Sequence, residues 1–232
     1  MNILILVKTL TFGGAERVAS LWANGFANHG HNVCVCTCRR DNVPDTYQVN
    51  KNIKRFNIYS WLLPKFSRIG IHPMAKKLKP IIDKVDPDVI ICVQGHWAEW
   101  AYKATRSSRI PIINTEHNSF ERPIYAPMPR KIWRAKFIEN KRYSAVTVLT
   151  EADSRCIGNR LNNVFVLPNP LTYSPLTDIP PKEKIILAAG RFDVWHYKGF
   201  DLLIKAWGMI APKNKEWTLY MCLLKDDWLL KY

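Results

Sequence analysis

Long hydrophobic runs are missing from this sequence, and no uninterrupted apolar stretch approaches the roughly 18 residues that a transmembrane helix requires. The apolar residues 1–8 have no cationic segment before them and are too few for the core of a signal peptide. We therefore interpret them as a buried first strand. A cytoplasmic protein is expected, with peripheral contact to the inner face of the cytoplasmic membrane as its closest approach to lipid.

The cysteines are not arranged as in a zinc site or a disulfide framework. The six cysteines include no Cys-x2-Cys pair of the kind that binds zinc, and they are too few for a secreted disulfide framework. Three of them, Cys34, Cys36 and Cys38, alternate with other residues in a run of strand composition. Alternate residues of a strand share one face, so we predict that these three are buried as small apolar side chains.

Glycine is sparse as well, at 10 of 232 residues, and the Gly-x-Gly-x-x-Gly fingerprint of dinucleotide-binding folds is absent. Only the pair Gly13-Gly14 follows the first predicted strand. Arg39-Arg40 after the second strand is similar to a site for a 2′-phosphate, which keeps an NADP-dependent oxidoreductase open as an alternative. The missing glycines remove the usual cradle for its pyrophosphate.

Basic residues are in large excess, with 34 Lys and Arg against 19 Asp and Glu and a formal net charge of +15. Such a surface attracts phosphates, anionic lipids or nucleic acid without distinguishing among them. No nucleic-acid-binding motif interleaves aromatic with basic residues, so no nucleic-acid partner is expected. Residues 129–143 have the pattern of a basic amphipathic helix around Ile132, Trp133, Phe137 and Ile138. Two interpretations remain for it: a solvated charged face above a core-packed stripe, or a surface for an anionic membrane.

Short apolar runs alternate with helical patterns, which is typical of a parallel sheet covered by helices on both faces. The predicted strands are 3–7, 33–37, 89–93, 110–114, 145–149 and 164–167, with predicted helices at 15–27, 71–85 and 129–143. A proline-rich stretch then has the composition of a linker, and a new strand-helix-strand unit follows it. We predict an α/β, Rossmann-like domain over 1–170, a linker over 171–184 and the start of a second Rossmann-like domain over 185–232.

Ligands of open parallel sheets bind beyond the carboxyl ends of the strands, where the loops into the following helices gather. The glycine pair Gly13-Gly14 lies in such a loop, at a helix N-terminus that suits an anion or a sugar hydroxyl. His96 and His117 follow two further strands, the second of them directly after Glu116. No helical i,i+4 pair or compact ligand cluster accompanies them, so no metal is expected.

The second predicted domain carries two cations around its first loop. Arg191 stands at the end of a predicted strand next to Gly190, and Lys198 stands just before a predicted helix next to Gly199. Two such side chains are suited to hold a diphosphate from both sides.

Four motifs in order resemble those of the retaining GT-B glycosyltransferases of family 4, over residues 1–219. They are Gly13-Gly14-Ala15-Glu16-Arg17, Thr115-Glu116-His117, Val166-Leu167-Pro168-Asn169-Pro170, and Gly190-Arg191 with Lys198-Gly199-Phe200-Asp201. Within that family the sequence is similar to bacterial enzymes that build capsule, exopolysaccharide and lipopolysaccharide. The resemblance implies a GT-B N-terminal domain that binds a lipid-linked or polysaccharide acceptor. It also implies a second domain that holds a UDP- or GDP-sugar, with no metal or other cofactor.

The resemblance also implies roles for single residues. His117 would lie near the transferred sugar, and Arg191 and Lys198 would neutralise the departing diphosphate, so these three are the catalytic candidates. The predicted donor-binding residues are Gly13, Gly14, Gly190, Arg191 and Lys198, and the predicted acceptor-binding residues are Glu16 and His96.

One departure from the family concerns the last residues. After 217–219 the family continues into a Gly-x-Gly turn and a Glu-x7-Glu segment that binds the donor sugar and ribose, and residues 220–232 contain neither. We expect a frameshift, a premature stop, a split gene or a fragment, and a chain that is inactive alone. The alternative is an acceptor-binding module of a split enzyme, whose partner supplies the donor domain.

Overall fold

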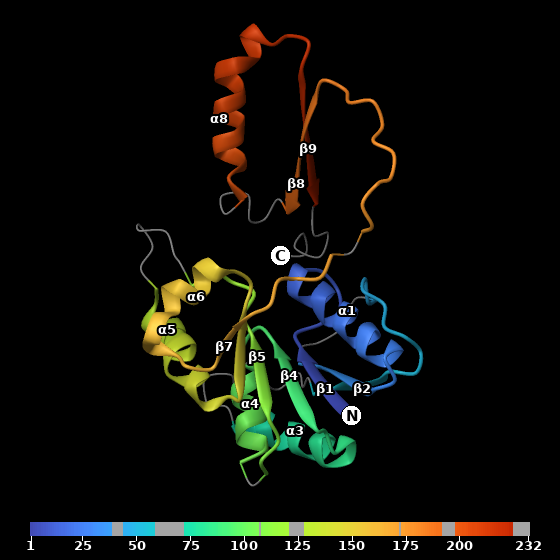
Figure 1. Ribbon diagram of the computed structural model, residues 1–232, viewed down its shortest axis with the longest axis vertical. Coiled ribbons are helices and arrows are strands. Elements are labelled where there is room, and N and C mark those ends of the chain that lie inside the picture. The colour runs from blue at the N-terminus through green and yellow to red at the C-terminus, as the bar shows by residue number, and fades with distance from the viewer. Residues whose placement is uncertain are drawn as a thin grey trace, which may run out of the picture. The chain divides into compact units, whose positions relative to one another are not determined.

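The structure is a computed structural model, and it describes residues 1–38, 44–58, 72–106, 108–120, 128–171, 173–191 and 198–224. The chain forms two compact units, Met1–Thr172 and Tyr173–Tyr232 (Figure 1). The division falls inside the proline-rich stretch 171–184.

The first unit is built on one parallel sheet of seven strands in the order β3-β2-β1-β4-β5-β6-β7. Its strands are β1 (Asn2–Val7), β2 (Asn32–Thr37), β3 (Lys54–Asn57), β4 (Val89–Val93), β5 (Ile112–Thr115), β6 (Ala145–Val148) and β7 (Val164–Val166). Its helices are α1 (Gly14–Asn28), α3 (His72–Val85), α4 (Trp97–Ala104), α5 (Arg130–Phe137) and α6 (Glu151–Ile157), with the 3-10 turns η1 (Glu139–Arg142) and η2 (Gly158–Arg160). The predicted α/β, Rossmann-like class is confirmed.

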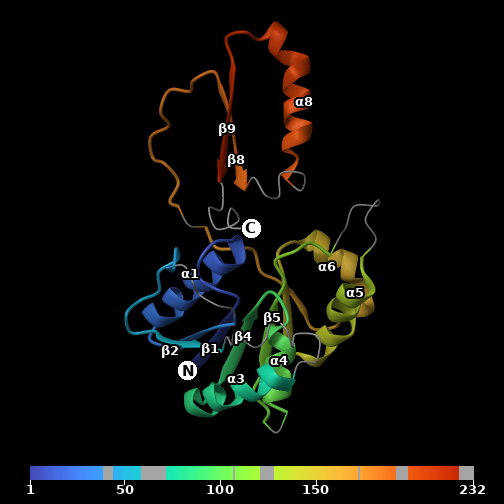
Figure 2. The same cartoon turned by 180° about the vertical axis from the view of Figure 1, so that it is seen from behind.

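Helices cover both faces of this sheet, as the alternation along β1 shows. Leu4 and Leu6 pack in a cluster with residues of α3 and α4, whereas Ile3, Ile5 and Val7 pack in a second cluster with residues of α1. Figure 2 shows α3 and α4 side by side, as in the opposite view of Figure 1. A strand buried on both faces must be apolar throughout, which is why the first residues of the chain read as a continuous hydrophobic run.

The cysteine prediction is confirmed for the second strand. Cys34, Cys36 and Cys38 are all buried in the same cluster as Leu4 and Leu6. Burial raises the pKa of Cys34 and of Cys38, so both thiols stay protonated and act as small apolar groups.

The second unit contains β8 (Ile185–Arg191), α8 (Phe200–Ile210), the 3-10 turn η4 (Ala211–Lys213) and β9 (Thr218–Leu224), with the two strands parallel. It leaves several large apolar side chains in solvent, among them Leu187 at 67%, Leu202 at 66% and Met209 at 80% exposed. Two strands and one helix offer too little surface to cover them.

The predicted helix over 129–143 is wrong in two respects. It ends as α5 at Phe137, and its remainder is the 3-10 turn η1, in which Asn140 is buried. The predicted apolar stripe is not core-packed either, because Ile132, Trp133 and Ile138 remain 42%, 43% and 40% exposed and only Phe137 is buried. Along the described residues, no helix is both long enough and apolar enough to cross a membrane.

Candidate active site

The sheet reverses its direction of growth between β1 and β4, and this switch point places two loops next to each other. From β1 the chain adds β2 and β3 on one side, and then adds β4 to β7 on the other. Residues 8–13 leave the carboxyl end of β1, and residues 94–96 leave that of β4. A crevice at such a point is where open α/β sheets bind their ligands. The structure therefore brings two of the predicted site loops together.

The two glycines of the pair after β1 differ in what the fold requires of them. Gly13 is the N-cap of α1 with φ of 134°, and a Cβ there would overlap the carboxylate of Glu16. Gly14 is different, because a Cβ at this position would meet no atom within 4 Å. The backbone at the N-terminus of α1 is thus open to a ligand at Gly14, with the amide groups and helix dipole that favour an anion.

Glu16 is buried beside this turn rather than extended into solvent. Its carboxylate lies against Gly13 in the first turn of α1, where a negative charge stabilises the helix. This position gives Glu16 a structural role in shaping the loop.

The loop after β4 holds two residues in left-handed conformations. Gln94 has φ of 50° and Gly95 has φ of 106°, and a Cβ on Gly95 would lie 2.9 Å from the ring of Trp97. A positive φ at a non-glycine residue costs free energy and is often kept at binding loops. His96 follows as the exposed N-cap of α4. This geometry turns the chain so that His96 emerges at the carboxyl edge.

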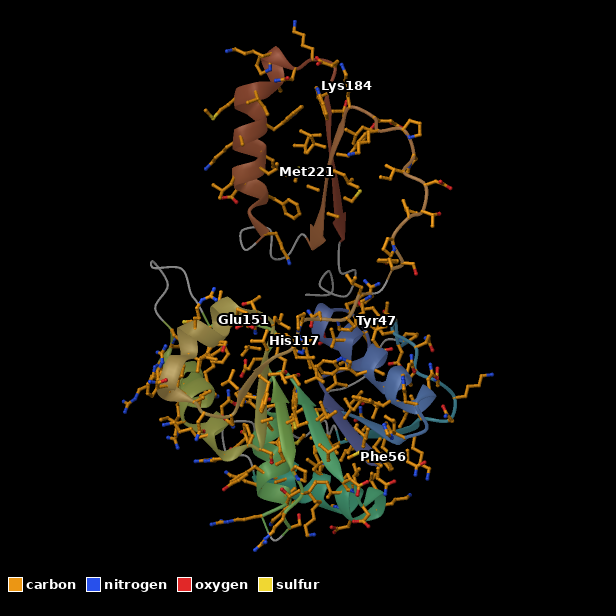
Figure 3. All side chains as sticks on the ribbon, in the orientation of Figure 1. Tyr47, Phe56, His117, Glu151, Lys184 and Met221 are labelled. Atoms are coloured by element: carbon orange, nitrogen blue, oxygen red, sulfur yellow. The ribbon has the colours of Figure 1, made fainter. Side chains whose placement is uncertain are left out.

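His117 lies just beyond β5, at the same edge of the sheet (Figure 3). Its ring centroid is 6.1 Å from that of Trp22 in α1. The Thr115 hydroxyl donates to the Cys92 carbonyl at 3.2 Å, and Thr115 Oγ1 lies 3.1 Å from His117 Nε2. We assign the hydroxyl proton to the Cys92 carbonyl, and in this assignment Nε2–H of His117 is the donor in the second bond. The neutral ring therefore carries its proton on Nε2 and a lone pair on Nδ1.

The Nδ1 atom of His117 is buried and has no hydrogen bond of ordinary geometry among the described residues, although the Asn169 side chain lies close enough to interact with the ring. Burial lowers the pKa of His117, and the nearby Asn169 side chain partly opposes that shift. The ring is thus neutral at neutral pH, with Nδ1 available as an acceptor. A buried acceptor without a partner is costly, so a hydroxyl group or water that donates to Nδ1 would be stabilised there.

The loop that carries His117 is held from one side by Lys136 of α5. The side chain of Lys136 is buried, and its Nζ donates to the carbonyls of Asn118 and Ser119 at 3.2 and 3.3 Å. The same ammonium lies 3.6 Å from Glu116 Oε2 and 3.7 Å from the centroid of the Phe120 ring. Four partners compensate the buried charge, which fixes the backbone around His117.

Asp153 of α6 holds the same loop from the other side. Its Oδ1 accepts from Ser119 Oγ at 2.8 Å and from the Phe120 amide at 2.7 Å. Burial acts to raise the pKa of Asp153, but these bonds, the Thr150 hydroxyl and Lys136 outweigh it, and the pKa is lowered. The carboxylate is therefore ionised, and the loop is clamped between α5 and α6.

Sequence reasoning missed three residues of this arrangement: Lys136, Asp153 and Asn169. Lys136 was grouped with the solvated basic residues of its helix, and only the packing of α5 shows that it points inward. Asp153 had a readable signal, because Thr150 and Asp153 have the spacing of a helix capping box, and the Thr150 hydroxyl accepts from the Asp153 amide here. Asn169 belongs to one of the four family motifs, but nothing in the sequence placed it beside His117.

In the second unit, three of the predicted donor residues lie around the end of β8. A Cβ on Gly190 would lie 2.8 Å from the Phe200 ring and 3.7 Å from Lys198 Cγ. Lys198 is exposed, and Gly199 has φ of 71° as the N-cap of α8. Arg191 is the last residue of β8, but its side chain and residues 192–197 lie outside the described residues. Lys198 is thus held next to the strand end that carries Arg191.

Within the described ranges, no group of three His, Cys, Asp or Glu side chains is placed to hold a metal ion. His96 and His117 stand on different loops, and His117 Nε2 is committed to Thr115. Lys198 is exposed in the second unit, where its ammonium is accessible to an anion.

A parallel sheet with its switch point at β1 and β4, followed by a second strand-helix-strand unit, defines a Rossmann-like enzyme fold of the GT-B kind. The sequence profile of the family described as Glycosyltransferase Family 4 matches residues 12–174. The chain belongs to this family, which confirms the resemblance to GT-B glycosyltransferases and leaves the oxidoreductase alternative without support.

Individual relatives agree with this assignment. The chain is 29% identical over 211 residues to an uncharacterized glycosyltransferase of Haemophilus influenzae, covering 89% of the chain and 57% of that protein. It thus spans little more than half the length of this relative.

Solved structures share the fold at low identity. TarM of S. aureus, in a complex with UDP and alpha-GlcNAc-glycerol, superposes with a TM-score of 0.67 at 11% identity, covering 96% of this chain and 72% of TarM. HepE of Anabaena, in a complex with UDP and glucose, gives a TM-score of 0.65 at 17% identity, covering 96% of this chain and 60% of HepE.

Proposed function

We propose that this chain is part of an enzyme that transfers a hexose or related sugar from a UDP- or GDP-sugar to a lipid-linked or polysaccharide acceptor. Transfer would retain the anomeric configuration and serve the synthesis of a cell-surface glycan. The observation that carries the proposal is His117, whose buried Nδ1 acceptor has no hydrogen bond of ordinary geometry among the described residues. A sugar hydroxyl supplies the donor that this atom needs.

The two units would divide the work. In the first, Gly13 and Gly14 would let the donor phosphate approach the start of α1, where a Cβ on Gly14 would meet no atom, and Glu16 and His96 would serve the acceptor side. In the second, Gly190, Arg191 and Lys198 would bind the diphosphate. Negative charge grows on the departing diphosphate, and two preorganised cations stabilise it without a metal. The solved complexes of TarM and HepE with UDP support a nucleotide-sugar donor.

Transfer would also need polypeptide beyond the second unit described here. The exposed apolar side chains of that unit need a covering surface, and the family's Glu-x7-Glu segment is absent from the 232 residues. We propose that the rest of a donor domain, on the same or a separate chain, completes the site. A separate chain would make this one an acceptor-binding module of a split enzyme.

A chimaera tests the proposal. Residues 1–219 joined to the remaining donor-domain residues of the Haemophilus influenzae relative are expected to transfer sugar from a UDP- or GDP-sugar, whereas the 232-residue chain alone is expected to stay at background. The measurement is release of nucleoside diphosphate with bacterial lipid-linked saccharides as acceptors. Robust turnover by the 232-residue chain alone would contradict the proposed role of the missing segment. A folded chimaera that is inert with every sugar nucleotide would contradict the proposed function.

We also propose that α5 binds an anionic membrane, which would bring a lipid-linked acceptor to the site. Arg130, Lys131 and Arg134 are exposed on α5 beside the half-exposed Ile132 and Trp133. Cations above amphipathic apolar side chains are typical of a helix that lies in the membrane interface. The basic segment 76–79 of α3 would add to this attraction.

Sedimentation with vesicles tests this surface. The chain is expected to bind vesicles with anionic lipid more tightly than neutral ones, with binding weakened by salt, because each basic residue near the surface contributes about 1 kcal/mol. Changing Arg130, Lys131 and Arg134 to Glu should abolish the preference. The matched control changes Lys182, Lys213 and Lys215 of the second unit to Glu, which alters net charge equally. Equal loss of vesicle binding in both variants would contradict the proposal that α5 binds the membrane. So would wild-type binding to neutral vesicles that is as tight as to anionic vesicles at low salt.

A further inference from the structure

A pocket at the amino-terminal edge of the sheet lies away from the loops of the proposed transfer site. It has a volume of about 240 Å³. Its lining includes Ile112 and Ser144, which lie where β5 and β6 begin. The end of α4 and the turn after it supply Tyr102, Arg106 and Arg109, and η1 supplies Arg142. Because the strands are parallel, the carboxyl-edge loops that carry His96 and His117 lie at the opposite edge.

The charge in this pocket is of one sign. Its described lining holds three guanidinium groups and no carboxylate. Arg106 and Arg109 are exposed, and neither forms an ion pair with any residue that the structure describes. Both guanidinium groups are therefore available to an anion at the pocket.

Arg142 is held in place by its own partners. Its Nη1 donates to Glu99 Oε1 and Oε2 at 3.3 and 3.1 Å, and its guanidinium carbon lies 5.6 Å from the centroid of the Tyr102 ring. The buried Glu99 also lies 3.6 Å from Lys103 Nζ, so two cations already neutralise this one carboxylate. Arg142 is therefore preorganised, and the surroundings of the pocket keep a net positive charge.

The pocket also offers a hydroxyl donor. Ser144 Oγ accepts from the Ile112 amide at 3.3 Å, which leaves its own proton available. Ser108 Oγ donates to the Thr105 carbonyl at 3.1 Å and keeps its lone pairs for a protonated oxygen. Guanidinium forks together with hydroxyl groups match a group that has several oxygens on one centre.

We propose that this pocket binds a phosphate group in its monoester form. The charge of a monoester near −2 and its three terminal oxygens suit the three guanidinium groups and the Ser144 hydroxyl. Such a group can come from a soluble phosphorylated metabolite or from the headgroup of an anionic lipid. The site is independent of the proposed sugar transfer, because it uses none of the residues at the carboxyl edge.

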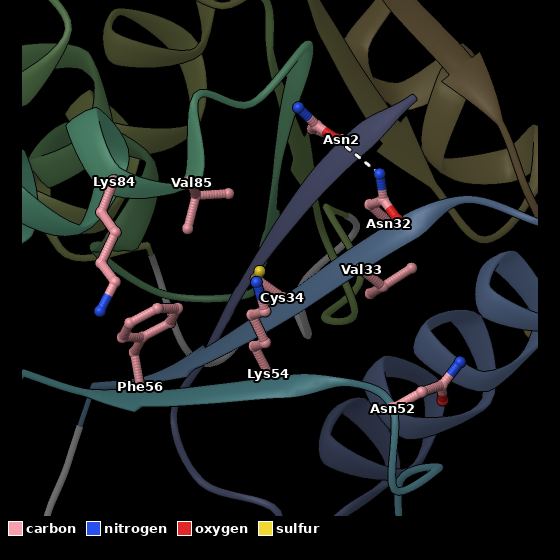
Figure 4. Close-up of a pocket in the computed structure, with 9 residues that line it drawn as sticks. All are labelled: Asn2, Asn32, Val33, Cys34, Asn52, Lys54, Phe56, Lys84 and Val85. Carbon is pink, nitrogen blue, oxygen red and sulfur yellow. Dashed lines mark hydrogen bonds between the residues drawn. The ribbon is translucent and has the colours of Figure 1, made fainter.

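A second pocket at the same edge provides the matched control. It has a volume of about 340 Å³ and holds two ammonium groups, Lys54 and Lys84, instead of guanidinium forks (Figure 4). Lys84 Nζ lies 5.8 Å from the centroid of the Phe56 ring, and Asn32 Nδ2 donates to Asn2 Oδ1 at 3.1 Å. These groups are partly engaged with one another, so we expect only diffuse attraction for anions there.

Titration of the 232-residue chain with inorganic phosphate, at constant ionic strength and followed by amide NMR shifts, tests the site. Wild type is expected to show saturable shifts around Arg106, Arg109 and Ser144. Arg106→Gln with Arg109→Gln should weaken binding about tenfold for each arginine removed. Lys54→Gln with Lys84→Gln, which removes the same charge, should leave it unchanged. No saturable binding by folded wild type, or equal weakening in both double variants, would overturn the proposal.

Vesicles distinguish the two sources of the phosphate. Phosphatidic acid carries a monoester, whereas phosphatidylglycerol carries a diester, and the two are compared at equal surface charge. Tighter binding to phosphatidic acid that is lost in the Arg106→Gln, Arg109→Gln variant supports the site with a lipid as its source. Equal binding to both vesicles, with inorganic phosphate still bound at the pocket, supports the site with a soluble metabolite as its source.

Discussion

Replacement of Lys198 by alanine, in the chimaera that carries a complete donor domain, is expected to lower sugar transfer by roughly a hundredfold or more. Arg191→Ala should have a similar effect. Both cations would face the diphosphate oxygens where negative charge grows as the glycosidic bond breaks. Their removal takes away an interaction that is stronger in the transition state than in the ground state, so kcat should fall more than KM rises.

The surroundings of Lys198 explain why we expect a large effect of its replacement. Its Cγ lies 3.7 Å from the Cβ position of Gly190, and the buried Phe200 ring fills the space that a larger residue at 190 would need. The base of the lysine side chain therefore lies beside the end of β8, and the residue is exposed to a ligand. A larger residue at 190 would displace either Phe200 or Lys198.

Lys205 is the control for this prediction, because it is exposed on α8 of the same unit. Lys205→Ala should leave transfer within about twofold of wild type, since a solvated surface charge contributes little. The measurement is steady-state transfer for each variant. If Lys205→Ala is as damaging as Lys198→Ala, or if both clamp variants stay within about twofold of wild type, Lys198 and Arg191 do not act on a diphosphate.

Much of the fold could be predicted from the sequence where burial decides the pattern. β4 occupies the predicted residues, and β1 and β2 differ from prediction by one residue at their starts, because central parallel strands are apolar on both faces. The edge strand β3 was missed, since only Phe56 of its four residues is even partly buried. An edge strand paired on one side lacks the apolar signal on which such a prediction depends.

The candidate site could be predicted only as a set of loops. Parallel strands end at one edge, so the sequence was enough to bring the loops with Gly13, His96 and His117 to that edge. It did not determine which side chains turn inward. Lys136 and Arg134 are both basic and lie two positions apart. Lys136 is nevertheless buried under the His117 loop, whereas Arg134 is exposed. Tertiary packing of α5 decides between them.

His117→Ala is expected to lower transfer in the chimaera by about a hundredfold, because the ring is held by Thr115 and its buried Nδ1 would accept a hydrogen bond from the sugar. A hydroxyl of the transferred sugar donating to Nδ1 would be lost in this variant. His96→Ala is the comparison, since this residue should affect the apparent affinity for the acceptor more than the rate. Equal effects of the two substitutions on rate and on acceptor affinity would argue against separate roles.

The neutral state of His117 also predicts how stability depends on pH, in an experiment that needs no activity. The pKa of His117 is lowered in the fold from 6.5, mainly by burial. Below pH 6.5 the unfolded chain therefore binds a proton that the folded chain rejects, and stability falls as the pH drops toward the folded pKa. His117→Gln, which cannot take up that proton, should lack this part of the decline. Thermal unfolding between about pH 5 and 8 should give parallel curves for the two proteins above pH 7, with wild type losing more below it. Parallel curves over the whole range would mean that His117 ionises as readily in the fold as in the unfolded chain. The ionised ring would carry a proton on Nδ1, so this atom would be a donor and not the acceptor proposed for the sugar.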